Sequence, residues 1–260
     1  MSDAKVPHGF DPVRAAALDA IARIELGADT SDAVTDAIKD RNLRPLDIRF
    51  LLQLVNGTTK MRRRLDYEIK FYLAKPSQKL QPILLNILRL GFYQLLFTDK
   101  VPAAAAVFES VNLAHKFADP SQARLVNAVM RSRLREPQKV VFPDKIADPQ
   151  RYLANFYSYP DHFVDYCLRE FGAERAELLL ASYNKPRRAT YRVNTLKASF
   201  EDVSTLLAKN NIPFTKGQYL PEFIHVDSAG LPLELELVQS GKVYVQDESS
   251  GMAVRMLNPK

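Results

Sequence analysis

A helix that is apolar on nearly all sides constrains this chain more than any other feature. Between residues 83 and 97 the only charged or amide side chains are Asn86, Arg89 and Gln94. A helix of this kind must be wrapped by other elements. It is shorter than the roughly 20 apolar residues that a membrane-spanning helix needs. The segment therefore predicts the centre of a helical bundle.

Two more helices are expected directly after this central helix. Val101-Pro102 forces a turn before the first, and Asp119-Pro120 gives the second a cap followed by proline at its first position. The apolar residues then recur at helical spacing. The expected core residues are Val107, Val111, Ala114 and Phe117 on the first, and Ala123, Val126, Met130 and Leu134 on the second.

Three helices are predicted before the central one. The first begins at Asp11-Pro12, the second is expected to be capped by Ser31, and the third runs from Pro45 to Lys75. Gly57 interrupts the third, either to let another helix approach closely or to divide the segment in two. The expected inward-facing residues are Val13, Ala17, Ile21 and Ile24 on the first helix, and Val34 and Ile38 on the second.

Between Glu136 and Pro149 the hydrophobic periodicity fades and prolines cluster, which is typical of a linker. We therefore expect a helical domain over residues 1–140 and a second domain over residues 148–260, because domain boundaries fall in such stretches. Helical periodicity returns over residues 152–184.

The last part of the chain predicts a small α/β layer. The fold class is thus an all-α bundle, followed by a helical region broken at Pro160 and Gly172 and by this α/β layer. A helix capped by Ser199 is expected after the first strand. The expected strands are 189–193, 212–214 and 223–226. After them, Val243 and Val245 alternate with Tyr244 and Gln246 before a helix expected from about Ser249.

The formal charge of +6 and the pI of about 9.3 favour a polyanionic partner. Basic residues gather in three runs, for each of which a solvated surface is the plainer alternative. The candidate RNA-binding residues are Lys60, Arg62, Arg63 and Arg64 in the first run, Arg131 and Arg133 in the second, and Lys185, Arg187, Arg188, Arg192, Asn194 and Lys197 in the third.

The third run lies in the most informative motif, PRRATYRVNTLK at residues 186–197. Arg192 and Lys197 can bind phosphates, whereas the amide of Asn194 can read a base edge or a ribose hydroxyl. The alternative is that Asn194 caps a turn after the strand and that Arg192 pairs with an acid such as Glu201.

Cys167 is the only cysteine, and its aromatic and aliphatic neighbours predict burial rather than nucleophilic chemistry. One cysteine excludes an internal disulfide framework and a cysteine-rich zinc site, as is usual in a reducing cytosol. The histidines show no metal-ligand spacing, and the first residues show no signal-peptide pattern. We therefore expect a cytoplasmic protein without a metal or a membrane anchor.

Three stretches resemble one enzyme family, the bacterial small-subunit rRNA cytosine-5 methyltransferases of the RsmB/Sun type. GFYQLLFTDKVPAAAAVFESVNLAHK with LVNAVMR is similar to the NusB-like RNA-binding domain of that family. PRRATYRVNTLK resembles the segment before its catalytic domain, a small layer compared with RNA-recognition folds. VYVQDESSGMAV is similar to the segment that leads into its S-adenosylmethionine site.

The resemblance implies small-subunit rRNA as the partner and S-adenosylmethionine as the cofactor of the full-length protein, and we expect a monomer. The donor loop and the two catalytic cysteines would lie beyond Lys260, so we expect no catalytic or cofactor-binding residue, and no bound cofactor, in these residues. A non-catalytic NusB-like RNA-binding or antitermination module is one alternative. A helical scaffold for protein interactions is another.

Overall fold

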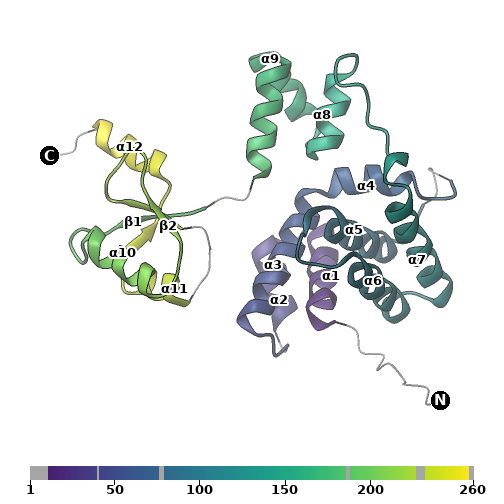
Figure 1. Cartoon of the computed structure of the whole chain (residues 1–260), viewed down its shortest axis with the longest axis horizontal. Helices are drawn as coiled ribbons and strands as arrows, with labels where there is room; N and C mark the ends of the chain where they lie inside the picture. Colours follow the sequence, from purple (N-terminus) through teal and green to yellow (C-terminus); the bar gives the residue numbers. More distant parts are fainter. Residues whose placement is uncertain (1–10, 40, 76–78, 186–187, 227–231, 258–260) are drawn as a thin grey trace. The chain divides into compact units, whose positions relative to one another are not determined.

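The computed structural model describes residues 11–39, 41–75, 79–185, 188–226 and 232–257. It divides into two compact units, Met1–Asn184 and Lys185–Lys260. Figure 1 shows helices in the first unit, and strands with helices in the second. The predicted fold class, helices followed by an α/β layer, is confirmed. Among the described helices, none combines the length and the apolar character that crossing a bilayer requires.

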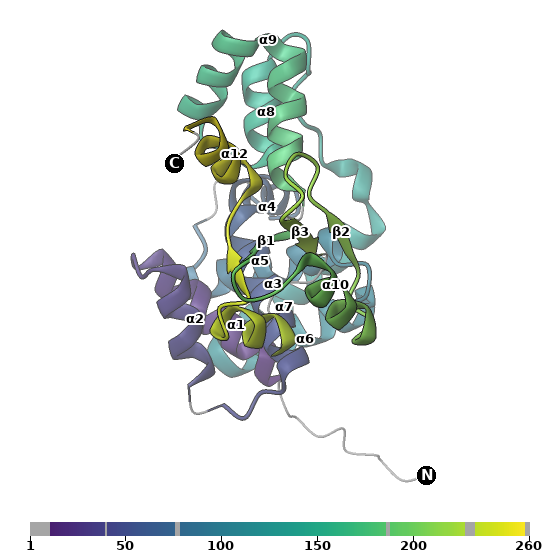
Figure 2. The same ribbon diagram turned by 90° about the vertical axis from the view of Figure 1, so that its left-hand side faces the viewer.

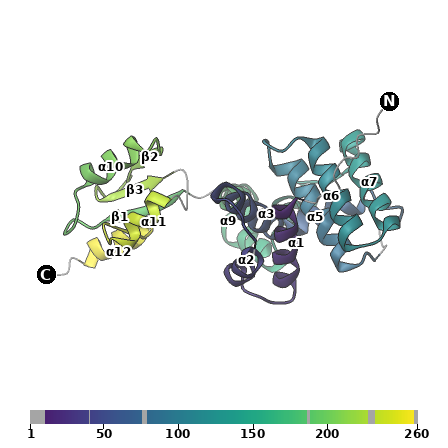
Figure 3. The same cartoon turned by 90° about the horizontal axis from the view of Figure 1, so that it is seen from below.

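The apolar segment is helix α5, which lies at the centre of the first unit as predicted. It starts with Pro82 at its first position, and most of its side chains are buried. Figure 3 shows α5 between α1 on one side and α6 and α7 on the other. The helices of this bundle are α1 Pro12–Glu25, α2 Thr30–Ile38, α3 Pro45–Lys60, α4 Arg62–Lys70, α5 Pro82–Phe97, α6 Ala103–Phe117 and α7 Pro120–Arg135.

Side-chain caps set several of these helix starts. Asp11 and Asp119 accept backbone N–H groups at the starts of α1 and α7, as predicted. The prediction for α2 was wrong, because Asp29 caps it and accepts the N–H of Ser31. Asp29 precedes the helix and accepts a backbone N–H of its first turn, so Ser31 lies inside the helix.

The predicted third helix is two helices that break at Met61 rather than at Gly57. Gly57 lies inside α3 against Tyr93 of α5, where an added Cβ would come within 2.0 Å of the tyrosine ring. Of the two alternatives, close helix approach is therefore correct for Gly57. The second helix ends at Lys70, before the predicted Lys75.

Two predicted core residues lie on the surface of the bundle instead. Phe117 is 42% exposed and Leu134 is 45% exposed, whereas Val107 and Met130 earlier on the same helices are buried. Leu134 lines a surface groove between α6 and α7 instead of entering the core.

Two further helices complete the first unit, α8 Pro149–Tyr157 and α9 Asp161–Asn184. The breaks predicted at Pro160 and Gly172 are confirmed, since α9 begins after Pro160 and Gly172 has a φ of 74° inside it. Cys167 is fully buried between these helices, and burial raises the pKa of its thiol. These two helices group with the bundle, and the predicted linker is the segment by which the chain reaches them.

The second unit is a four-stranded antiparallel sheet with the β-α-β-β-α-β order of ferredoxin-like folds. Strand order is β2-β3-β1-β4. Helices α10 and α11 cover one face, and Figures 1 and 2 show α12 on the other side of the sheet from α10. The elements are β1 Ala189–Val193, α10 Phe200–Lys209, β2 Phe214–Lys216, β3 Phe223–Val226, α11 Pro232–Gln239, β4 Val243–Val245 and α12 Glu248–Leu257.

The predicted bounds of β1 and β3 are confirmed, and Ser199 forms a capping box with Asp202 at the start of α10. Strand β4 lies within the alternating stretch 243–246. Strand β2 lies two residues after the predicted 212–214. Sequence reasoning missed α11, whose alternating Leu and Glu residues have no clear helical period.

Candidate nucleic-acid interface

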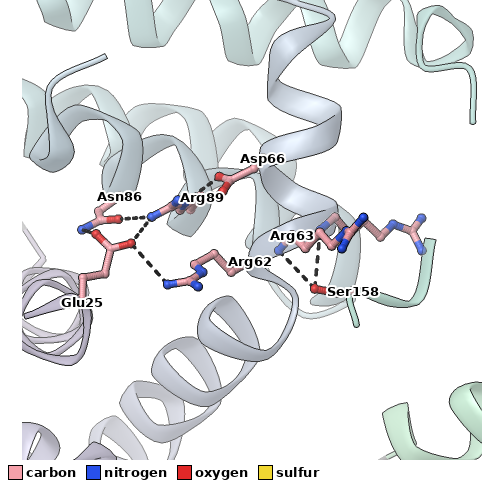
Figure 4. Close-up of polar contacts among 8 residues, drawn as sticks. Glu25, Arg62, Arg63, Asp66, Asn86, Arg89 and Ser158 are labelled. Atoms are coloured by element: carbon pink, nitrogen blue, oxygen red, sulfur yellow. Dashed lines mark hydrogen bonds and ion pairs between the residues drawn. The ribbon is translucent and has the colours of Figure 1, made fainter. Parts of the chain in front are cut away.

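The first basic run lies where helices α8 and α9 meet the bundle. Helix α4 begins at Arg62, and the side chain of the preceding residue, Met61, does not cap it. Ser158, in the turn between α8 and α9, accepts the backbone N–H groups of Arg63 and Arg64 at 3.1 and 3.5 Å and donates to the carbonyl of Lys60 at 2.9 Å. Ser158 thus caps α4 from another part of the chain (Figure 4).

The cap gives a first testable expectation. Ser158→Ala should lower the free energy of unfolding by about 0.5–2 kcal/mol, the usual effect of losing a helix cap. Ser182→Ala is the matched control, because its hydroxyl is exposed and donates only to Leu179 in its own helix. Urea unfolding followed by circular dichroism measures both, and equal losses would contradict the capping role.

Arg63 connects the two helical parts through its side chain as well. Its Nε donates to Asn155 Oδ1 at 3.0 Å and its Nη2 donates to Asp161 Oδ1 at 2.7 Å. The hydrogen bond from Arg63 holds the pKa of Asp161 below its usual value. Arg63 therefore contributes to the junction between α4 and α9.

Arg64 is the most enclosed member of this run. Its guanidinium carbon lies 4.3 Å from the ring centre of Phe156 and 5.5 Å from that of Phe142. Its Nε donates to the buried Glu68 at 3.1 Å, and Arg133 of the second run donates to the same carboxylate at 3.2 Å. One buried carboxylate thus joins residues of two basic runs, and a buried carboxylate needs such partners.

The exposed cations of the first run line a groove of about 640 Å³ beside the α8–α9 turn. Arg62 is its most accessible arginine, with a side chain that is 57% exposed and lies 3.8 Å from Glu25. The Nζ of Lys60 donates to the carbonyl of Tyr183 at its edge. The cationic residues lining the groove are Lys60, Arg62, Arg63 and Lys70, against Asp66 and Asp161.

A buried ion network fixes the acidic side of this groove. Arg89 of α5 is 7% exposed and donates to both oxygens of Asp66 at 2.6 and 2.7 Å. It also pairs with Glu25 and Asn86 (Figure 4). Burial alone would lower the pKa of Arg89, but the bonds to Asp66 and Glu25 raise it. Sequence reasoning missed this network, although two polar residues three apart on an apolar helix signal a shared buried partner.

The two arginines predicted in the second run face different surroundings. Arg133 is bound to Glu68, whereas Arg131 donates to Asn127 at 2.8 Å and lines a groove of about 520 Å³ between α6 and α7. The sequence run is therefore not one continuous basic surface.

In the second unit, the RVNTLK turn is bound to the turn before β4. Asn194 donates from Nδ2 to the carbonyl of Gly241 at 2.9 Å and accepts the N–H of Leu196 at 3.3 Å. Lys197 donates to the carbonyl of Ser240 at 3.1 Å. Asn194 thus has the turn-capping role considered from the sequence, and its contact with RNA stays a prediction.

Arg192 lies on the face of the sheet away from α10. Its guanidinium carbon is 5.6 Å from the ring centre of Tyr244 on β4. Glu201, the acid considered as its partner, belongs to α10 on the opposite face. Nearby, Arg188 donates to Thr215 at 3.4 Å and Lys185 is exposed, while Arg187 lies outside the described residues.

Glu248, in the VQDESS stretch, holds the β2–β3 connection. It is 5% exposed and accepts three backbone N–H groups, from residues 218, 219 and 220, at 2.6 to 3.1 Å. His225 Nε2 lies 3.3 Å from it. Burial alone would raise the pKa of Glu248, but these donors favour the carboxylate and hold the pKa below its usual value. Sequence reasoning missed this role, because its partners lie far away in the chain.

Glu248→Gln should lower the stability of the second unit at neutral pH by about 1–3 kcal/mol, because an amide leaves buried N–H donors unsatisfied. The pKa of Glu248 is lower in the folded than in the unfolded protein. The carboxylate therefore stabilises the fold at pH values above the unfolded-state pKa, and this contribution is lost as the pH falls through the folded-state pKa. Urea midpoints at several pH values should therefore converge for variant and parent in acid. A constant difference at every pH would contradict the account.

Two protein-family models match separate segments of this chain. The NusB family model matches residues 11–135, and the Methyltr_RsmF/B-like, ferredoxin-like domain model matches residues 159–232. The crystal structure of PH0851 covers 100% of this chain and 57% of its own, with a TM-score of 0.64 and 20% identity, which supports the fold.

Sequence relatives cover nearly the whole chain. The probable ribosomal RNA small subunit methyltransferase B of Bacillus subtilis (strain 168) is 33% identical over 95% of this chain and 55% of its own length. The protein of the same name from Synechocystis sp. (strain ATCC 27184 / PCC 6803 / Kazusa) is 31% identical over 89% of this chain and 52% of its own length. The chain thus spans about half the length of these curated relatives. It is a homologue of the ribosomal RNA small subunit methyltransferase B proteins, and within it the match to the NusB family precedes the match to the RsmF/B-like ferredoxin-like domain.

Proposed function

We infer that this chain is the RNA-binding portion of an S-adenosylmethionine-dependent rRNA (cytosine-C5) methyltransferase. The observation that carries the proposal is the cationic groove on α4, in a chain homologous to rRNA methyltransferases over 95% of its length. Phosphate contacts by Lys and Arg supply most of the affinity for RNA and position the protein on it. The partner would be small-subunit rRNA, bound in the cytoplasm by a monomer.

The methyl transfer itself would be carried out by residues outside these 260. The resemblance implies a cysteine thiolate that adds to cytosine C6, so that C5 can accept a methyl group. Cys167 does not fit that role, because it is fully buried and burial raises the pKa of its thiol. The β4–α12 connection does not fit a donor site either, since it has no glycine-rich loop.

A non-catalytic RNA-binding or antitermination module is the second candidate, and the NusB family match favours it. It accounts for residues 11–135 and leaves the ferredoxin-like domain without a role. The two candidates differ in whether RNA affinity depends on the second unit. Arg192→Glu should weaken rRNA binding under the methyltransferase proposal and leave it unchanged for a NusB-only module.

A separate experiment tests whether these 260 residues bind the methyl donor or transfer a methyl group. Titration of the chain with S-adenosylmethionine in a calorimeter should show no binding. Cys167→Ala should leave rRNA affinity nearly unchanged, because the thiol is fully buried and does not line the cationic groove. If these 260 residues alone bound S-adenosylmethionine or methylated rRNA, the proposal that methyl transfer needs residues outside them would be wrong.

A further inference from the structure

The sheet of the second unit has two unlike faces. One face carries the core side chains that α10 and α11 cover, including Tyr191, Val193 and Ile224. Because side chains alternate along a strand, Arg192 points to the other face. Helix α12 covers only part of that face, where the buried Phe223 ring contacts Gly251. The rest of the face carries polar and aromatic side chains.

Strand register places an arginine between two aromatic rings on this second face. Arg192 of β1 is opposite Phe223 on β3 and opposite Tyr244 on β4. Phe223 is fully buried, whereas Tyr244 is 46% exposed. The Arg192 guanidinium carbon lies 5.6 Å from the centre of the exposed ring. A cation therefore lies over one face of an accessible aromatic ring on the surface of the sheet.

The polar neighbours of this pair are already held in place. Thr190 Oγ1 lies 3.0 Å from His225 Nδ1, and His225 Nε2 lies 3.3 Å from Glu248. Glu248 is occupied by backbone N–H groups of the β2–β3 connection. Glu248 is thus bound within the protein, and Arg192 supplies the positive charge next to Tyr244.

This pairing suits a nucleotide outside a helix. An aromatic side chain can stack on a base only when the base is not already stacked in a duplex, and a neighbouring guanidinium can then bind the adjoining phosphate. A continuous duplex offers phosphates but no open base face. A site built on such a pair would therefore favour single-stranded RNA over double-stranded RNA.

We propose that the open face of this sheet binds one unpaired RNA nucleotide, with its base stacked on Tyr244 and its phosphate on Arg192. The inference rests on the proposed RNA-binding function and adds the subsite and the kind of RNA it takes. The remaining basic residues then bind the surrounding paired RNA through phosphates alone.

The test compares two RNA probes on the 260-residue chain, an unstructured oligouridylate and a blunt RNA duplex of the same length. Tyr244→Leu should weaken binding of the oligouridylate by about 5- to 150-fold, the range for one stacked base, and leave duplex binding unchanged. Tyr244→Phe keeps the ring and should retain binding. Tyr219→Leu is the matched control, since Tyr219 is a 63% exposed tyrosine of the same unit.

Each outcome decides between the claims. Loss of oligouridylate binding confined to Tyr244→Leu supports the stacking site. Equal losses for both probes, or equal losses for Tyr219→Leu, overturn it while the proposed RNA function stands. If the parent chain binds neither probe nor rRNA, both the stacking site and the proposed function fail. Circular dichroism of each variant shows whether a loss comes from unfolding.

Discussion

Replacing Arg89 with methionine is expected to lower the free energy of unfolding by about 3 kcal/mol, at the low end of the range for breaking a buried ion pair. Arg89 is 7% exposed and binds Asp66 and Glu25. Its removal leaves Asp66 without its arginine partner and leaves Glu25 with only the more distant Arg62. The side chains of Asp66 and Glu25 are 30% and 24% exposed, and this partial hydration keeps the effect below the maximum. Methionine preserves much of the packed volume.

The matched control is Arg62→Met in the same groove. Its side chain is 57% exposed and lies 3.8 Å from Glu25, so its loss should change stability by less than about 1 kcal/mol. Urea unfolding followed by circular dichroism reports on both variants. Similar losses for Arg89 and Arg62 would mean that the network does not stabilise the bundle.

The second large effect is on RNA affinity. If about five phosphates are contacted, affinity for rRNA should fall by about two to three decades over a fourfold increase in salt. Arg62→Glu and Arg192→Glu should each reduce the slope of log affinity against log salt by about 1 or more, since each removes a phosphate contact. Filter binding over a salt series measures these slopes.

Lys209→Glu is the control for charge alone. It lies exposed on α10, which covers the opposite face of the sheet from Arg192. Lys209→Glu should change RNA affinity only weakly, through the change in the net charge of the protein. Equal losses for Lys209 and Arg192, or an affinity indifferent to salt, would favour a protein-interaction scaffold.

The sequence predicted helices and strands well where the interactions that form them lie within one segment. The apolar run of α5 identified the bundle centre, and the strand-favouring residues 189–193 predicted β1 with its observed bounds. Asp119 followed by proline located the start of α7. In each case the deciding interactions lie within a few residues of one another, so the sequence displays them.

The candidate site was harder to predict because its contacts join distant segments. Ser158 caps α4 from more than 90 positions away, and Glu248 holds residues 218–220. Nothing local in the sequence marks either partner. The basic runs show the same limit, since charge is visible in the sequence whereas the carboxylate that binds Arg64 and Arg133 is not.

Arg14 is a further example. The sequence places it on the first helix with no basic run around it, and nothing local marks it as buried. In the structure it is 7% exposed, donates to Gln94 at 2.7 Å and lies 5.1 Å from the ring centre of Phe50.

The central claim is that this chain is the part of an rRNA methyltransferase that binds small-subunit rRNA. Its most direct test is a competition filter-binding measurement with labelled small-subunit rRNA and an excess of unlabelled large-subunit rRNA of matched length. We predict that the chain retains the small-subunit RNA and that unlabelled small-subunit RNA displaces it at lower concentration than the large-subunit competitor does. Equal displacement by both RNAs, or no retention at all, would contradict the claim.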